Sequence, residues 1–112
     1  MVKILFICHG NICRSVSAQY IFQDLVNRRG LAGQFVIDSA ATSTEEIGNA
    51  IYPPMRAALE RRGVPVGTHR ARQLKRSDYD AYDLLIGMDE ENMFYMKQIL
   101  GDDPEGKIHY LM

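Results

Sequence analysis

Residues 2–15 of the chain read VKILFICHGNICRS. Residues 2–7 form a near-continuous apolar run, which is typical of a strand buried on both faces of a parallel sheet. Beyond residue 15, apolar residues recur at spacings of three and four, which indicates one face of a helix. A loop between a strand and a helix directs backbone N–H groups and the positive end of the helix toward one small concavity. The sequence therefore predicts an anion-binding loop over residues 8–15, with Ser15 as the N-cap of the helix.

The remainder of the chain alternates between strand and helix patterns. These patterns predict strands over 35–37, 83–88 and 107–112, helices over 16–29, 53–62 and 90–100, a short helical turn at 77–80 and a loop over 64–74. Asp89 is the expected N-cap of the last helix. The alternation predicts an α/β fold with a doubly wound parallel sheet and right-handed crossovers. Ligands of such folds lie beyond the carboxyl ends of the strands, where residues 8–15 fall.

The composition restricts the class of protein. With 112 residues the chain has room for one domain, residues 1–112, and its hydrophobic content of 46% permits a packed core. A net charge of −1 argues against a nucleic-acid binder that uses a broad basic face. No apolar run approaches the ~20 residues that span a bilayer, and the first run is too short for a signal peptide. The two cysteines provide no disulfide framework, so we expect a cytoplasmic protein without nucleic-acid or membrane partners.

Cys8 and Arg14 are the candidate catalytic pair of this loop. The field that binds an anion also stabilises a thiolate, which is the nucleophilic form of cysteine. A planar guanidinium can hold two oxygens of one phosphate, as an ammonium cannot. Gly10 allows the loop to curl, and the Ser15 hydroxyl can donate a hydrogen bond to the Cys8 sulphur. The pattern predicts phosphoryl transfer onto Cys8 without a metal or cofactor, and the competing interpretation is a buried cysteine beside a surface arginine.

Four segments along the chain resemble the low-molecular-weight protein tyrosine phosphatases: CHGNICRS at 8–15, DSAATS at 38–43, HRARQL at 69–74 and GMDEEN at 87–92. The resemblance implies a flavodoxin-like fold of three layers around a four-stranded parallel sheet. It also implies a phosphotyrosine-containing protein or a small aryl phosphate as substrate, and a cysteinyl-phosphate intermediate. The implied catalytic residues are Cys8, Arg14 and Ser15. The implied phosphate-binding residues are His9, Gly10, Asn11, Ile12, Cys13 and Arg14, and the implied loop supports are Asn11, Ser39 and His69.

Cys13 has two possible roles. It can pack behind the loop, or it can form a reversible disulfide with Cys8 that protects the nucleophile from overoxidation. In the family that the chain resembles, a second cysteine of this kind is a redox switch, and we favour that role.

Other activities on the same fold were compared with the sequence. Arsenate reductases of this type use a later cysteine pair, and no cysteine follows Cys13. Protein-arginine phosphatases usually carry threonine where this chain has Ile12, whose side chain suits a flat phenyl ring better than a guanidinium. Phosphotyrosine is therefore the favoured substrate. A protein-arginine phosphatase, and a phosphate- or phosphotyrosine-binding module without turnover, remain alternatives.

The chain also departs from the family pattern. The family continues past a position like Met112 into a loop whose aspartate is the general acid, and then into a final helix. We therefore expect weakened turnover of phosphotyrosine. Either the 112 residues are a fragment of a longer chain, or the sheet face that the final helix would cover is covered otherwise, for example by self-association. Asp103-Pro104 is expected to be a surface turn rather than a substitute acid. At the rim of the binding pocket, residues 44–46 read TEE, where many members of the family have an aromatic residue. The two glutamates should disfavour acidic phosphopeptides, unless this loop is merely a solvated surface segment. Tyr52 could supply the aromatic wall of the pocket instead.

Overall fold

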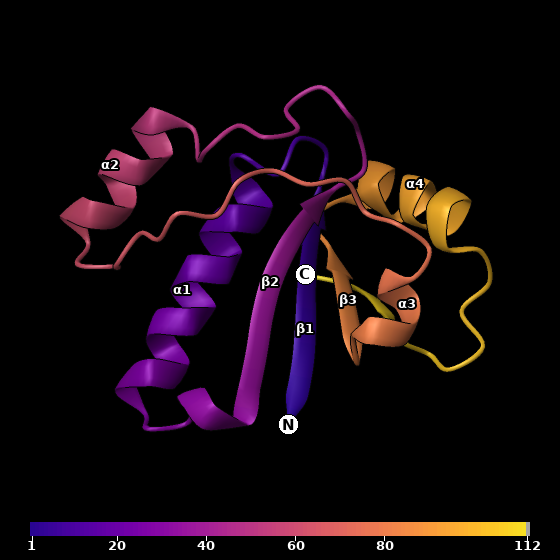
Figure 1. Cartoon of the computed structure of the whole chain (residues 1–112), viewed down its shortest axis with the longest axis horizontal. Coiled ribbons are helices and arrows are strands. Elements are labelled where there is room, and N and C mark those ends of the chain that lie inside the picture. The colour runs from indigo at the N-terminus through magenta and orange to yellow at the C-terminus, as the bar shows by residue number, and fades with distance from the viewer. Residues whose placement is uncertain (112) are drawn as a thin grey trace.

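The computed structural model describes residues 1–111 and shows a parallel sheet between helices (Figure 1). The strands are β1 (Val2–Cys8), β2 (Phe35–Ala41), β3 (Leu84–Gly87) and β4 (Ile108–Tyr110), and their order across the sheet is β2-β1-β3-β4. All three strand pairs are parallel. This order is the flavodoxin-like one, so the predicted fold class is confirmed. The predicted last strand is present, although its final residue, Met112, lies outside the described residues.

Helices cover both faces of the sheet. They are α1 (Arg14–Arg28), α2 (Pro53–Arg61), α3 (Asp78–Ala81) and α4 (Glu90–Leu100), with a short 3₁₀ helix at Ala32–Gln34 before β2. α1 packs on one face of the sheet, α3 and α4 pack on the other, and α2 packs against α1. The described helices agree with the predicted ones within about two residues at each end. No helix within residues 1–111 is both long and apolar enough to cross a membrane.

β1 lies in the centre of the sheet, which explains its continuous apolar run. Successive side chains of a strand point to opposite faces. Leu5 and Ile7 are buried against α3 and α4, whereas Ile4 and Phe6 are buried against α1. The prediction of a strand buried on both faces is confirmed.

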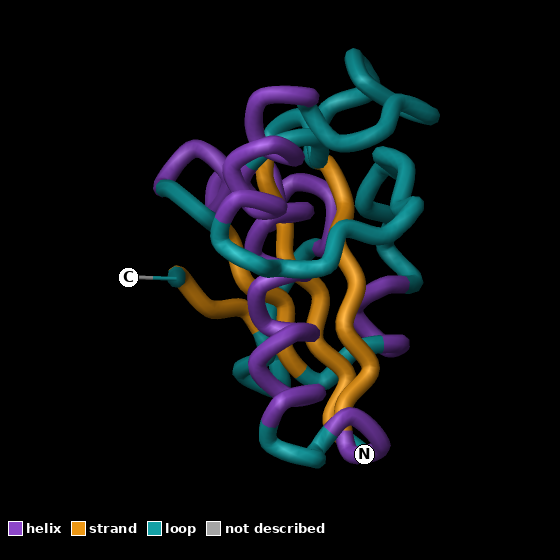
Figure 2. Tube along the Cα trace, turned by 90° about the vertical axis from the view of Figure 1, so that its left-hand side faces the viewer, coloured by secondary structure: helices purple, strands orange, loops and turns teal. Residues whose placement is uncertain are grey.

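The carboxyl ends of the strands bring three loops together. Figure 2 shows loop segments gathered beyond the upper ends of the strands. Cys8 ends β1 opposite Ala41, the last residue of β2, and the amides of residues 42 and 43 donate to the carbonyls of residues 8 and 9 at 2.9 and 3.0 Å. β3 ends beside them at Gly87, where a Cβ atom would lie 2.9 Å from the sulphur of Met96 on α4. This glycine therefore allows α4 to lie close to the edge where the loops meet.

Two predicted boundaries were wrong. β2 continues to Ala41 rather than ending at residue 37, because it pairs with β1 along its full length and the polar Asp38 and Ser39 find hydrogen-bond partners inside the fold. α1 begins at Arg14, so Ser15 is not its N-cap; the N-cap position is Cys13, which makes no side-chain capping bond. The prediction of Asp89 as the N-cap of α4 is confirmed, and it forms a reciprocal capping box with Asn92.

Candidate active site

The sulphur of Cys8 lies at the carboxyl end of β1 and faces three hydrogen-bond donors. Cys8 is buried, and its Sγ is 2.9 Å from the Ser15 hydroxyl and 3.3 and 3.4 Å from the backbone nitrogens of Asn11 and Ser15. The Asn11 side-chain amide donates to the Ser15 hydroxyl oxygen at 2.8 Å. A hydroxyl oxygen can accept this bond and still donate its own hydrogen, and a Cys8 thiolate, which has no hydrogen to give, accepts it. Three donors around one sulphur stabilise negative charge on it.

Asn11 holds the loop in an unusual backbone conformation. Its φ is +60°, in the left-handed region that residues other than glycine rarely adopt, although asparagine does so more readily than most. The side chain is buried, and its Oδ1 accepts hydrogen bonds from His69 Nε2 at 2.8 Å and from the Arg72 amide at 3.3 Å. The 69–72 segment therefore anchors the loop. Strained residues held in this way are concentrated at functional sites.

His69 connects this anchor to β2. Its Nε2 lies 3.2 Å from the Ser39 hydroxyl, which donates to the side-chain oxygen of Gln19 on α1, and its Nδ1 lies 3.3 Å from Asp38 Oδ1. Burial disfavours the charge on Asp38, but hydrogen bonds from His69 and from the Ser39 amide outweigh it and lower the pKa of Asp38. The structure thus brings Asn11, Ser39 and His69 into one network beneath the loop.

A hollow of about 230 Å³ lies above the sulphur. Its lining comes from the loop and from two acidic residues of the segment after β2: Cys8, His9, Gly10, Ile12, Cys13, Arg14, Glu45 and Glu46. Five of the six residues expected to bind phosphate therefore line the hollow, and the sixth, Asn11, supports it from below. Cys13 is a free, half-buried thiol that lines the same hollow as Cys8.

Arg14 is positioned by a residue that sequence reasoning treated only as a helix cap. The Nη1 of Arg14 donates to Asp89 Oδ2 at 2.7 Å. Asp89 also accepts from the Asn92 amide, and that bond, together with the Arg14 bond, lowers the pKa of Asp89. The hydrogen bond to Asp89 in turn raises the pKa of Arg14. The two residues are 75 positions apart, so the only sequence signal for this pair was that both lie in segments of the family resemblance.

Asp103 lies away from the hollow. Its Oδ1 accepts from the Tyr79 hydroxyl at 2.6 Å and from the Lys107 amide at 2.7 Å, and its Oδ2 accepts from the Ile108 amide at 3.0 Å. These contacts fix the turn before the amino end of β4, whereas Cys8 lies at the carboxyl end of β1. The prediction that Asp103-Pro104 is a structural turn agrees with this placement.

Two further expectations concern the rim and metals. Tyr52 is the N-cap of α2, and its amide donates to the Ile12 carbonyl at 2.8 Å, but Tyr52 does not line the hollow. Tyr95 of α4, which sequence reasoning missed, lines a neighbouring cavity together with His9. Tyr95 was read only as part of a helix, since nothing in the sequence places α4 beside residues 42–45. Within residues 1–111 there is no group of three or more His, Cys, Asp or Glu side chains placed to hold a metal ion.

Comparison with known proteins gives consistent results. The model of the low molecular weight phosphotyrosine protein phosphatase family matches residues 3–112. The chain is 39% identical over 101 residues to the low molecular weight protein-tyrosine-phosphatase YfkJ of Bacillus subtilis, covering 90% of this chain and 65% of that protein. It is 40% identical over 91 residues to the low molecular weight phosphotyrosine protein phosphatase of Homo sapiens, covering 81% and 57%. The chain thus spans less than two thirds of the length of each of these relatives.

Solved structures of similar proteins share the fold of this chain. The crystal structure of YfkJ from Bacillus subtilis superposes with a TM-score of 0.95 at 37% identity, covering 99% of this chain and 70% of that one. The crystal structure of a Drosophila arginine phosphatase superposes with a TM-score of 0.86 at 29% identity, covering 98% and 71%.

Proposed function

The chain belongs to the low molecular weight phosphotyrosine protein phosphatase family, and from this premise we propose that it hydrolyses phosphotyrosine in proteins, or small aryl phosphates, by way of a phosphoryl group carried on Cys8. The observation that carries the proposal is the set of three donors around Cys8 Sγ at the base of a hollow that Arg14 also lines. A thiolate in this position has a space of about 230 Å³ in front of it, and the Arg14 guanidinium belongs to the wall of that space.

The first chemical step is an in-line displacement at phosphorus. The Cys8 thiolate attacks, a sulphur–phosphorus bond forms, and the bond from phosphorus to the phenolic oxygen breaks. Backbone N–H groups of the loop and the Arg14 guanidinium, which lines the hollow, would stabilise the charge on the phosphoryl oxygens in the transition state. Asp89 keeps the guanidinium at the edge of the hollow, so less of its motion has to be lost when phosphate binds.

The second step reverses the role of the sulphur. A water molecule attacks the phosphoryl group, the sulphur–phosphorus bond breaks, and Cys8 leaves as a thiolate while inorganic phosphate is released. The Ser15 hydroxyl and the two backbone N–H groups stabilise the departing thiolate. Neither step calls for a metal or another cofactor.

Proton delivery to the leaving phenolate is separable from these steps. The Asp103 carboxylate is hydrogen-bonded within the turn before β4, and Asp89 is paired with Arg14. Neither carboxylate is therefore free to supply the proton from its observed position. Comparing aryl phosphates whose leaving groups differ in basicity measures this contribution, because general acid catalysis contributes about 10²–10⁴-fold and most for poor leaving groups.

The substrate class is tested by comparing a phosphotyrosine peptide with a phosphoarginine peptide. Ile12 places an apolar side chain in the wall of the hollow, which favours a phenyl ring. The similarity to an arginine phosphatase keeps phosphoarginine as the second candidate. We expect higher kcat/KM on phosphotyrosine, and faster hydrolysis of phosphoarginine would reverse the assignment.

The alternative of a binding module without turnover predicts a different time course. Mixing the protein with p-nitrophenyl phosphate should release a burst of p-nitrophenol close to the enzyme concentration, followed by slower turnover. Saturable phosphotyrosine binding with no burst would favour the module. In that case Cys8→Ser should bind phosphotyrosine as tightly as the unaltered protein.

Self-association is proposed for the sheet face that carries α1. Ile21 and Leu25 of α1 are 50% and 39% exposed, and Leu84 and Ile86 of β3 are only partly buried on the same side. Exposed apolar side chains on one side of a protein favour association between copies. We expect a mass above that of a monomer in light scattering, reduced by Ile21→Glu; a monomer at all concentrations would overturn the proposal.

The two free thiols fit a reducing compartment, and for that reason we propose a cytoplasmic location.

A further inference from the structure

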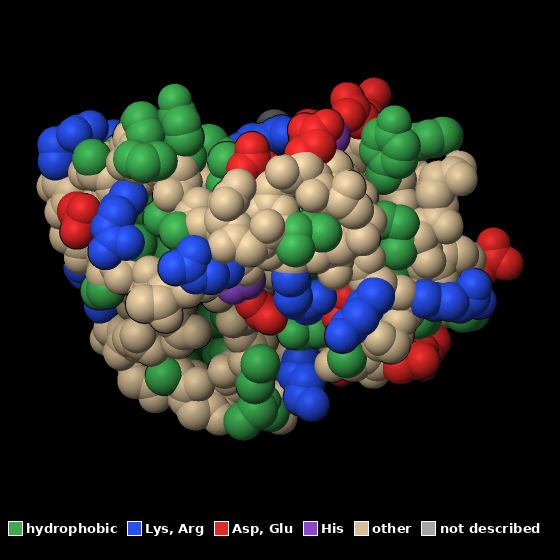
Figure 3. All heavy atoms as spheres, turned by 45° about the horizontal axis from the view of Figure 1, so that its top comes forward, with side chains coloured by type: hydrophobic (Ala, Val, Ile, Leu, Met, Phe, Trp, Pro, Cys, Tyr) green, Lys and Arg blue, Asp and Glu red, His purple; other side chains and the backbone are tan. Residues whose placement is uncertain are grey.

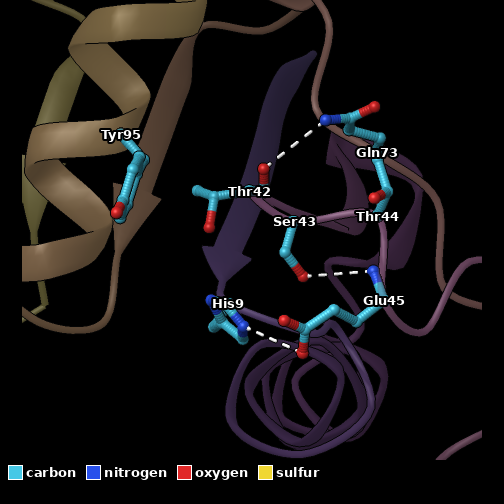
Figure 4. A pocket seen from close by; sticks show the side chains of 7 residues that line it. All are labelled: His9, Thr42, Ser43, Thr44, Glu45, Gln73 and Tyr95. Atoms are coloured by element: carbon cyan, nitrogen blue, oxygen red, sulfur yellow. Dashed lines mark hydrogen bonds and ion pairs between the residues drawn. The ribbon is translucent and has the colours of Figure 1, made fainter.

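A second cavity lies next to the hollow above Cys8. Its volume is about 320 Å³, and its walls come from residues 42–45 after β2, from Gln73 and from Tyr95 of α4, with His9 at its floor (Figure 4). Figure 4 shows Tyr95 on one side of the open space and the 42–45 segment on the other. The mechanism described above does not use this space.

The two cavities share a wall. His9 and Glu45 line both of them, and His9 Nε2 lies 3.3 Å from Glu45 Oε2. A phosphotyrosine whose phosphate reaches Cys8 would lie against this pair, and the side chain of a neighbouring residue would be within reach of the second cavity, because consecutive Cα atoms of a peptide are only about 3.8 Å apart. The second cavity is placed to receive a side chain that flanks the phosphotyrosine.

One polar atom in the cavity has no partner among the described residues. Thr42 is 8% exposed, and its Oγ1 is buried without a hydrogen bond. The side chain lies on the wall that faces Tyr95 in Figure 4. Its carbonyl oxygen accepts only a long bond, 3.5 Å, from Gln73 Nε2. Buried polar atoms are nearly always paired, so the unpaired Thr42 Oγ1 indicates a place for a hydrogen-bonding group from outside the chain.

The remaining chemistry of the walls favours a cation. Glu45 contributes a carboxylate, and Tyr95 contributes an aromatic ring that is 42% exposed. Arg14 does not line this cavity, since its guanidinium pairs with Asp89 at the edge of the hollow above Cys8, and His9 lies 3.3 Å from Glu45. On the face that Figure 3 shows, several acidic side chains lie along the upper edge, with a basic side chain between them and a histidine next to them. Acceptor oxygens, a carboxylate and an aromatic face together make a site for a guanidinium or ammonium group.

We propose that this second cavity binds the side chain of an arginine or lysine adjacent to phosphotyrosine in the substrate, and so selects basic phosphotyrosine sequences. The proposal rests on the phosphatase function proposed above and adds the class of substrate sequence to it. The basic side chain donates to Thr42 Oγ1, pairs with Glu45 and lies against the ring of Tyr95.

The test uses phosphotyrosine peptides that differ only in the residue before or after the phosphotyrosine, with arginine, lysine, alanine or glutamate there. An exposed ion pair combined with a cation–π contact predicts kcat/KM for the arginine and lysine peptides about fivefold to tenfold above alanine, with glutamate lowest. Glu45→Gln and Tyr95→Ala should each lower the arginine-to-alanine ratio to about twofold or less. The matched control Glu91→Gln removes one carboxylate from the exposed start of α4, outside the cavity, and should keep the ratio of the unaltered protein.

Thr42→Val separates a binding role from a structural one. Removing a buried, unpaired hydroxyl should raise the unfolding temperature of the free protein while lowering the arginine-to-alanine ratio. A variant that is more stable but keeps the full ratio would exclude Thr42 from the site. Equal kcat/KM for the arginine, alanine and glutamate peptides in the unaltered protein would overturn the whole proposal.

The outcome does not depend on turnover. If the protein does not hydrolyse p-nitrophenyl phosphate, the proposed function fails, and the cavity is still tested by measuring the affinity of the same peptides for Cys8→Ser by fluorescence anisotropy. A preference for the arginine peptide there supports the cavity alone. The absence of any preference there overturns it.

Discussion

Replacing Ser15 with alanine removes the hydroxyl that lies 2.9 Å from Cys8 Sγ. The backbone N–H groups at 3.3 and 3.4 Å remain, so one donor of three is lost. A hydrogen bond to a charged group contributes ~1.5–3 kcal/mol, and ~1.4 kcal/mol corresponds to tenfold in rate. We therefore expect the step in which Cys8 leaves phosphorus as a thiolate to slow by about 10- to 100-fold.

Rapid-mixing kinetics with p-nitrophenyl phosphate measure this effect. Ser15→Ala should give a burst of p-nitrophenol close to the enzyme concentration, followed by slow steady-state turnover. The phosphorylated enzyme should accumulate and be detectable by mass spectrometry after acid quenching. Ser17→Ala is the matched control, because Ser17 is a buried serine of the same helix whose hydroxyl donates to the Cys13 carbonyl rather than to the sulphur. It should keep the kinetics of the unaltered protein.

Two results would refute this reasoning. An unchanged kcat for Ser15→Ala would mean that the hydroxyl does not stabilise the leaving sulphur. A burst that slows as much as the steady state, without accumulation of phosphorylated enzyme, would place the role of Ser15 in the shape of the loop. The Asn11 amide loses its acceptor in this variant, so a structural effect of that kind has a physical cause.

Three further substitutions probe features around this centre. Asp89→Asn removes the charge opposite Arg14 and should weaken competitive inhibition by inorganic phosphate about threefold to tenfold, since an exposed ion pair contributes ~0.2–1 kcal/mol and positioning adds to it. Hydrogen bonds from the Asn92 amide and from Arg14 lower the pKa of Asp89. The stability that the Asp89 carboxylate supplies is therefore present above the usual carboxyl pKa and is lost as pH falls below about 4. Acid unfolding of Asp89→Asn should show a smaller loss of stability in that pH range. Gly87→Ala places a Cβ 2.9 Å from a methionine sulphur of α4 and should lower the free energy of unfolding by about 1–3 kcal/mol, measured by urea denaturation. Cys13→Ser should prevent recovery of activity when a thiol reductant follows peroxide treatment, whereas the unaltered protein should recover through a disulfide with Cys8; equal recovery of both would exclude that disulfide.

Much of the fold follows from local patterns in the sequence. The apolar run before Cys8 predicted a central strand, and the alternation that follows predicted the order of strands and helices. These signals are local, because the spacing of apolar residues within one helix or strand indicates which face of that element is buried. The predicted end of β2 was wrong because contacts with a distant part of the chain decide where that strand ends. Asp38 and Ser39 look like the end of a strand, yet their polar groups are paired with His69, which lies about 30 residues further along the chain.

The candidate site shows the same division. Cys8, Arg14 and Ser15 could be named from one short segment, because their chemistry depends on a loop that the segment itself forms. Ser15 was also predicted to cap α1, and this was wrong because its hydroxyl faces the sulphur instead. The Arg14–Asp89 pair and the place of Tyr95 could not be predicted, since both depend on how α4 packs against the sheet.

The left-handed backbone of Asn11 has a consequence for the order in which the protein folds. The loop is near the start of the chain, but the group that holds it, His69, lies 58 residues later. Closing a contact of that length costs entropy that only the nearly complete fold repays. Residues 8–15 therefore emerge early during synthesis, but they acquire their final shape late. Local opening of the 69–72 segment should likewise release the loop first, and hydrogen exchange at the Asn11 amide should report it before the central sheet opens.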